Sequence, residues 1–77
     1  MKDLISYLVK NITGNEDFEV DEKNEDSLIV FTIRAKPEYM GLIIGKEGKT
    51  IKTIRNLVKV RATLEKKSIN LLVEELD

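Results

Sequence analysis

Apolar side chains recur at helical spacing near the start of the chain, where they form one stripe: Leu4, Ile5, Leu8, Val9 and Ile12. This spacing predicts an amphipathic helix over residues 1–13, with Asp3 as its cap and Gly14 as its stop. Residues 18–23 alternate between apolar and charged side chains, and residues 27–35 are rich in β-branched and aromatic side chains. Both patterns are typical of strands, and the turn-forming residues between them predict a hairpin with its turn at residues 24–26.

The second half of the chain predicts two helices and a last strand. Pro37 fits the first position of a short helix ending at residue 44, within which Gly41 is expected to allow close backbone packing. Residues 68–74 alternate and predict a strand. Between them, a longer helix over about residues 49–63 would place five apolar side chains on its core face: Ile51, Ile54, Leu57, Val58 and Ala62. The order α-β-β-α-α-β predicts an α+β fold, and we expect residues 1–77 to form a single domain because no linker or repeat interrupts them.

The composition removes several classes of function. The 77 residues include no cysteine and no histidine. Disulfides, zinc sites built from Cys and His, thiolate chemistry and imidazole catalysis are therefore excluded. No apolar stretch approaches the roughly 20 residues of a transmembrane helix, and no signal peptide is visible. We therefore expect a cytoplasmic protein without a membrane contact, a metal site or another cofactor.

The net charge of −1 conceals two oppositely charged segments. Residues 15–26 contain seven acids and one lysine, whereas residues 41–67 contain eight bases and two acids. A local basic patch attracts a polyanion even when the whole chain is slightly acidic. The second segment is therefore a candidate for contact with nucleic acid, and we expect the acidic segment to lie away from it.

The glycine pair Gly45 and Gly48 is the most informative motif, and three phosphate-binding interpretations compete for it. A Walker A loop would fit Gly48-Lys49-Thr50, but it requires a glycine where the chain has Ile43 and a strand before the loop. A dinucleotide-binding fingerprint fails at the same position and lacks a βαβ unit. A helix–GxxG–helix turn remains. Glycine has no Cβ, so a nucleic-acid backbone can approach closely, and such a turn can clamp about four nucleotides of a single strand.

The residues around this turn resemble the KH (K homology) domain. Its Ile-Gly-x-x-Gly-x-x-Ile core is matched here by Ile44-Gly45-Lys46-Glu47-Gly48-Lys49-Thr50-Ile51. The element order is that of the type II variant, which implies a three-stranded sheet with helices packed on one face. The length resembles that of the small bacterial single-KH proteins of the KhpA family. This resemblance implies an RNA chaperone or post-transcriptional regulator, working as a homodimer or with a larger KH-containing partner.

Basic residues extend the motif into a band along the longer helix. Lys46 lies on the turn, and four bases follow beside the core face: Lys49, Lys52, Arg55 and Lys59. The positive end of that helix, near Gly48 and Lys49, would favour a phosphate. We expect Arg61 to be only a solvent-exposed charge.

The resemblance also implies that Ile44, Ile51 and the edge of the 27–35 strand line an apolar groove for bases. Glu47 fits least well, because a carboxylate in the clamp repels phosphate. Either its side chain points to solvent or the affinity is low. The predicted RNA contacts are Ile44, Gly45, Lys46, Glu47, Gly48, Lys49, Ile51, Lys52 and Arg55.

These observations favour non-catalytic binding of single-stranded RNA through the helix–GxxG–helix clamp. The alternative is a protein-interaction module on the same scaffold, with weak or no RNA binding, in which Glu47 and the acidic segment serve assembly with a partner. A small nucleotide-binding enzyme would require magnesium-dependent nucleotide binding, and Ile43 argues against that hypothesis.

Overall fold

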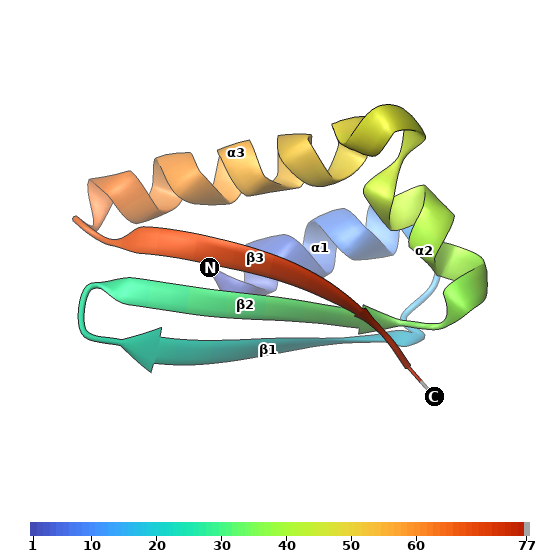
Figure 1. Cartoon of the computed structure of the whole chain (residues 1–77), viewed down its shortest axis with the longest axis horizontal. Coiled ribbons are helices and arrows are strands. Elements are labelled where there is room, and N and C mark those ends of the chain that lie inside the picture. Colours follow the sequence, from blue (N-terminus) through green and yellow to red (C-terminus); the bar gives the residue numbers. More distant parts are fainter. Residues whose placement is uncertain (77) are drawn as a thin grey trace.

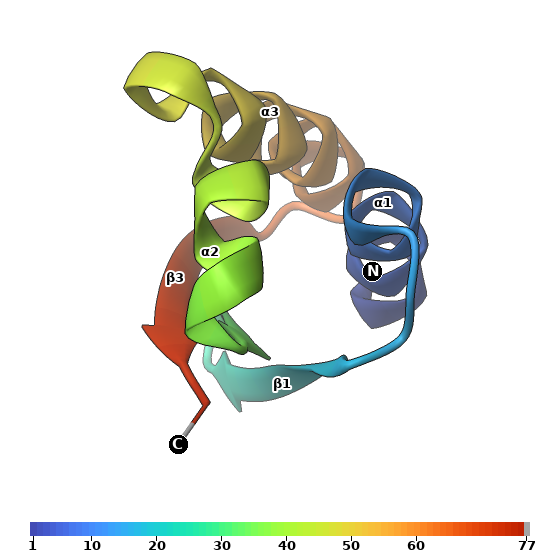
Figure 2. The same cartoon turned by 90° about the vertical axis from the view of Figure 1, so that its right-hand side faces the viewer.

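The computed structural model describes residues 1–76, and the predicted elements occur in the predicted order (Figure 1). They are α1 (Lys2–Thr13), β1 (Phe18–Glu25), β2 (Leu28–Ala35), α2 (Pro37–Ile44), the 3-10 helix η1 (Lys46–Gly48), α3 (Lys49–Leu64) and β3 (Ser68–Glu75). The strands form one sheet in the order β1-β2-β3, and the three helices cover one of its faces (Figure 2). The predicted α+β architecture is confirmed. Within residues 1–76, no helix has both the length and the apolar character that a membrane span requires.

The central strand, β2, pairs with its two neighbours in opposite directions. It is antiparallel to β1 and parallel to β3. A two-residue turn joins the antiparallel pair, with Asp26 in the left-handed region at φ 51°. The strand β1 therefore continues through Asn24 and Glu25. The turn was predicted two residues too early, at residues 24–26. The parallel pair instead needs a crossover connection, which consists of α2, η1 and α3.

Alternate residues of β2 form the centre of the core. Its buried side chains face the helices, and they are Ile29, Phe31, Ile33 and Ala35. The helices α1 and α3 cover them with Ile5, Val9, Ile54, Val58 and Ala62, all of which are buried. Complete burial of an aliphatic or phenyl side chain of this size contributes about 1.5–3 kcal/mol. Phe18 at the start of β1 is half-buried and packs against this cluster.

Three local predictions were wrong. Leu57 was expected in the core, but it is 47% exposed, because it lies about 100° around the helix from the buried Val58. Gly41 was expected to allow close packing, yet it is exposed and a Cβ built there would meet nothing within 4 Å. Asp3 lies in the first turn of α1, and the N-cap is Met1. The predicted stop at Gly14 is confirmed, with φ at 78°.

Arg34 connects all three strands on the open face of the sheet. From near the end of β2 its guanidinium binds Asp21 of β1, and its Nε lies 3.1 Å from Oε2 of Glu74 on β3. The hydrogen bond to Asp21, followed by that to Glu74, raises the pKa of Arg34 above its usual value. The two ion pairs of Arg34 therefore connect β2 to both of its neighbouring strands.

The end of α3 is closed by a left-handed turn. The N–H of Lys67 donates to the carbonyl of Ala62 (2.9 Å), and the N–H of Lys66 donates to the carbonyl of Thr63 (3.0 Å). This is the Schellman pattern, which usually places glycine at the position that Lys66 occupies with φ at 58°. The turn directs the chain from α3 straight into β3.

Replacing Lys66 by glycine should therefore stabilise the fold. A non-glycine residue in the left-handed region costs about 1 kcal/mol, so Lys66→Gly should raise the free energy of unfolding by about that amount. Urea denaturation monitored by circular dichroism measures this change. Lys67→Gly is the matched control, because Lys67 does not adopt a positive φ. Equal effects of the two substitutions would contradict the assignment of strain to Lys66.

Candidate nucleic-acid interface

The two glycines of the turn are required for different reasons. Gly45 adopts φ 77° and ψ 171°, a region that is essentially restricted to glycine. A Cβ at this position would lie 2.2 Å from Oγ1 and 2.9 Å from the backbone nitrogen of Thr50. Gly48 adopts φ 75° and ψ 15°, but a Cβ there would meet nothing within 4 Å. Gly45 thus brings the turn against the start of α3, whereas Gly48 only provides a left-handed residue.

Backbone hydrogen bonds hold the turn in a tight shape. The N–H of Gly48 donates to the carbonyl of Gly45 (3.1 Å), and the N–H of Lys49 donates to the carbonyl of Lys46. Glu47 and Gly48 are both left-handed, so residues 46–49 have the form of a type I′ turn. Glu47, with φ 58° and ψ 22°, lies exposed at the tip. The turn projects beyond the packed helices, where a ligand can reach it (Figure 1).

The N-terminus of α3 is open to an anion. No side chain caps it, and its first turn contains no acidic residue. The first backbone N–H groups of a helix carry a partial positive charge. Lys46 and Lys49, both exposed, add two full positive charges beside it. Together these groups are suited to holding a backbone phosphate.

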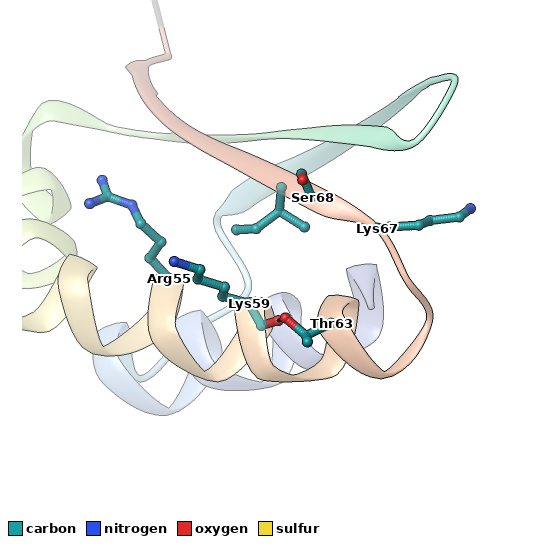
Figure 3. Close-up of a pocket in the computed structure, with 6 residues that line it drawn as sticks. Arg55, Lys59, Thr63, Lys67 and Ser68 are labelled. Atoms are coloured by element: carbon teal, nitrogen blue, oxygen red, sulfur yellow. Dashed lines mark hydrogen bonds between the residues drawn. The ribbon is translucent and has the colours of Figure 1, made fainter.

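A cleft of about 340 Å³ lies between α3 and β3, further along the helix from the turn. The side chains of Arg55 and Lys59 extend from α3 over this space, and Lys67 extends away from it at the far end (Figure 3). The strand β3 is an edge of the sheet, paired only with β2. The residues that line the cleft are Arg55, Lys59, Thr63, Lys67, Ser68 and Ile69.

This arrangement corrects the predicted groove. The 27–35 strand cannot form its edge, because β2 lies in the middle of the sheet and β3 occupies the edge beside α3. Of the predicted RNA contacts, only Arg55 lines the cleft. Ile44 is 38% exposed and Ile51 is half-buried against the core. The predicted site did not include the other cleft residues on and before β3, for which only Ser68 and Ile69 had a signal, the alternation of that strand.

Acidic partners neutralise none of the bases around the turn and the cleft. The ion pairs among residues 1–76 involve Lys10, Lys23, Arg34 and Lys36. Six basic residues around the turn and the cleft form no ion pair within the described part of the chain: Lys46, Lys49, Lys52, Arg55, Lys59 and Lys67. We call these six residues the basic surface. The acidic strand β1 lies at the opposite edge of the sheet, as expected. No group of metal-ligating side chains occurs within the described residues.

A helix–GxxG–helix crossover between parallel strands, beside a cleft that an edge strand borders, defines the type II KH domain. The model of the family described as KhpA/KhpB, KH domain, matches residues 2–73. The chain is 36% identical over 70 residues to the RNA-binding protein KhpA of Clostridium perfringens, covering 90% of this chain and 93% of that protein. It is 36% identical over 76 residues to the RNA-binding protein KhpA of Chlamydia caviae, covering 97% of each.

A solved structure has the same fold. A variant of Era from Aquifex aeolicus bound to GDP·AlF4− matches with a TM-score of 0.67 and 16% identity, over 96% of this chain and 29% of the Era chain. The architecture is therefore that of a type II KH domain, as predicted. The chain belongs to the KhpA/KhpB KH-domain family.

The two glycines should differ in their tolerance of alanine. Gly48→Ala should cost about 1 kcal/mol of stability, since the space around it is open and only the backbone is strained. Gly45→Ala should cost at least about 2 kcal/mol, because strain is added to a clash with Thr50. Urea denaturation of the two variants compares these costs directly. Equal losses would show that the contact between Gly45 and Thr50 is unimportant.

Proposed function

We propose that this protein binds single-stranded RNA without catalysing a reaction, with residues 1–77 acting as a single domain in the cytoplasm. The observation that supports this most strongly is the basic surface. Its six lysine and arginine residues surround an uncapped helix N-terminus and a cleft. An unneutralised patch of this kind attracts a polyanion. The names of the Clostridium and Chlamydia relatives, RNA-binding protein KhpA, agree with this function.

The turn would bind the RNA backbone, and the cleft would bind nucleobases. Gly45 and Gly48 allow the RNA backbone to approach the turn, where Lys46 and the N-terminus of α3 meet a phosphate. Further phosphates follow along α3, where Lys49 and Lys52 lie, and Arg55 reaches the cleft. Nucleobases would enter the cleft beside β3, and Ile44 and Ile51 would contact nucleobases nearer the turn. Because Glu47 is exposed at the tip, its carboxylate can remain in solvent during binding.

Such binding suits an RNA chaperone or a post-transcriptional regulator, which must hold single strands without cleaving them. A small surface binds weakly by itself. Joining two such surfaces raises the overall affinity without any new contact to RNA. The proposed role therefore gains from association of two copies.

Reversing the charge of the turn should abolish RNA binding. Replacing Lys46 and Glu47 together by aspartate places two carboxylates where a phosphate must approach, so binding of a short single-stranded RNA should be lost while the fold is kept. Fluorescence anisotropy measures the affinity, and circular dichroism checks the fold. For the parent protein, the log–log dependence on salt should have a slope of about 0.7 per neutralised phosphate.

Arg61→Asp provides the control for this experiment. It changes the net charge by the same amount, but at an exposed residue of α3 that lies outside both the turn and the cleft lining. RNA binding should change little in this variant. If the double variant at Lys46 and Glu47 folds and still binds RNA as the parent does, the turn is not the RNA clamp. That result would favour a protein-interaction module.

A second surface of α3 suggests how two copies associate. Leu57, Val60 and Leu64 are 47%, 64% and 79% exposed. Their spacing of three and then four residues is that of the seam of a coiled coil. This apolar stripe points away from the core, and none of its residues lines the cleft.

We propose that the apolar stripe pairs with the same stripe of a second copy. Burial of exposed leucine and valine side chains against a similar surface lowers the free energy of the associated state. The side of α3 that carries Arg55 and Lys59 is not part of the stripe, so both clefts would stay open to RNA. A larger KH-containing partner that offers an equivalent helix is the alternative occupant.

A charge in the apolar stripe should separate the copies. Val60→Glu would bury an unpaired carboxylate in the interface, so sedimentation velocity should detect a dimer of the parent protein and a monomer of the variant. Asn70→Glu, on the exposed face of β3, is the matched control and should remain dimeric. A parent protein that remains monomeric would exclude the homodimer and leave the KH-containing partner as the occupant.

A further inference from the structure

The lining of the cleft contains hydrogen-bond donors in excess. Three of its six residues have basic side chains, and none has an acidic side chain or a side-chain amide. Arginine and lysine only donate hydrogen bonds. The hydroxyl of Thr63 already donates to the backbone carbonyl of Lys59, at 2.9 Å. A nucleobase that presents acceptors to the three basic side chains would be satisfied, whereas an exocyclic amino group facing these side chains would meet only donors.

Arg55 differs from every other residue of the basic surface. The other five are lysines, which act as flexible point charges, whereas a guanidinium offers a planar pair of N–H donors in fixed geometry. The guanidinium of Arg34 is already held by two carboxylates. That of Arg55 has no acidic partner within residues 1–76, and it lies over the space between α3 and β3 (Figure 3). The paired N–H donors of Arg55 are therefore available to form hydrogen bonds with a ligand.

We propose that Arg55 reads a base in the cleft and selects guanine, an inference that rests on the RNA binding proposed above. Guanine presents two adjacent acceptors, O6 and N7, which match a guanidinium in a bidentate pair. Adenine places an amino group at the corresponding position. Cytosine can offer its adjacent acceptors O2 and N3 only with the N4 amino group beside them, so in both cases an amino group would face the donors of Arg55 or Lys59. Uracil offers a single carbonyl oxygen there and satisfies only one donor.

The competing role for Arg55 is contact with a backbone phosphate. A phosphate contact depends on charge and gives no preference among bases. Lysine preserves the charge but lacks the bidentate geometry. The substitution Arg55→Lys therefore distinguishes the two roles, since it retains a phosphate contact and removes the reading of guanine.

The test uses the full chain and short oligouridine strands in which one central position is varied among G, A, C and U. Fluorescence anisotropy gives the affinity of the parent protein and of Arg55→Lys for each strand. We expect the parent to prefer the strand with guanine by about tenfold. Arg55→Lys should bind all four strands with nearly equal affinity. Arg61→Lys, the same substitution on the same helix at a residue outside the cleft lining, is the control and should keep the preference.

Two results would overturn the inference, and they are distinguishable from each other. Parent protein that binds all four strands equally, or a preference that survives in Arg55→Lys, would show that Arg55 does not select guanine, while leaving RNA binding intact. Absence of binding to any strand by folded parent protein would overturn the proposed function and this inference together.

Discussion

The parallel pairing of β2 with β3 is the constraint on which the functional surface depends. Parallel strands cannot be joined by a tight turn, so the chain between Ala35 and Ser68 must leave one end of the sheet and return to the other. The helices α2 and α3 make this return, and the turn from Gly45 to Gly48 lies where the chain changes direction between them. The same return places α3 beside β3, so the turn and the cleft both arise from a single topological requirement.

The sequence predicted the elements and the glycine turn, but not the neighbours of each strand. Periodicity and glycine positions are local properties, and they identified every helix and strand to within about two residues. In β2 the outward residues Leu28 and Val30 are as apolar as the buried Ile29 and Phe31, so the run does not show which face or edge is covered. The groove edge was assigned to this strand from the family resemblance alone, and the residue pattern could not correct that assignment. Which strand lies at the edge depends on contacts between distant segments, and the alternation within one segment does not contain that information.

The helix α3 has three sides with different surroundings, which explains why Leu57 was wrongly predicted to lie in the core. Apolar character predicts that a helical residue meets something apolar, but not whether this is the core of its own chain. Ile54, Val58 and Ala62 meet the core, the basic side borders the cleft, and Leu57 belongs to the apolar stripe. Because the three sides share few contacts, substitutions on one side should leave the others nearly unaffected.

The edge strand β3 links the completion of the fold to the occupation of the cleft. Ser68 and Ile69 form one wall of the cleft, and β3 pairs with β2 residues that lie 40 positions earlier in the chain. Contacts between such distant residues carry a large loop-closure entropy and tend to form late in folding. A newly synthesised chain therefore has no cleft until β3 has docked. Conversely, any ligand that occupies the cleft adds its binding free energy to the attachment of β3 and protects that edge from opening.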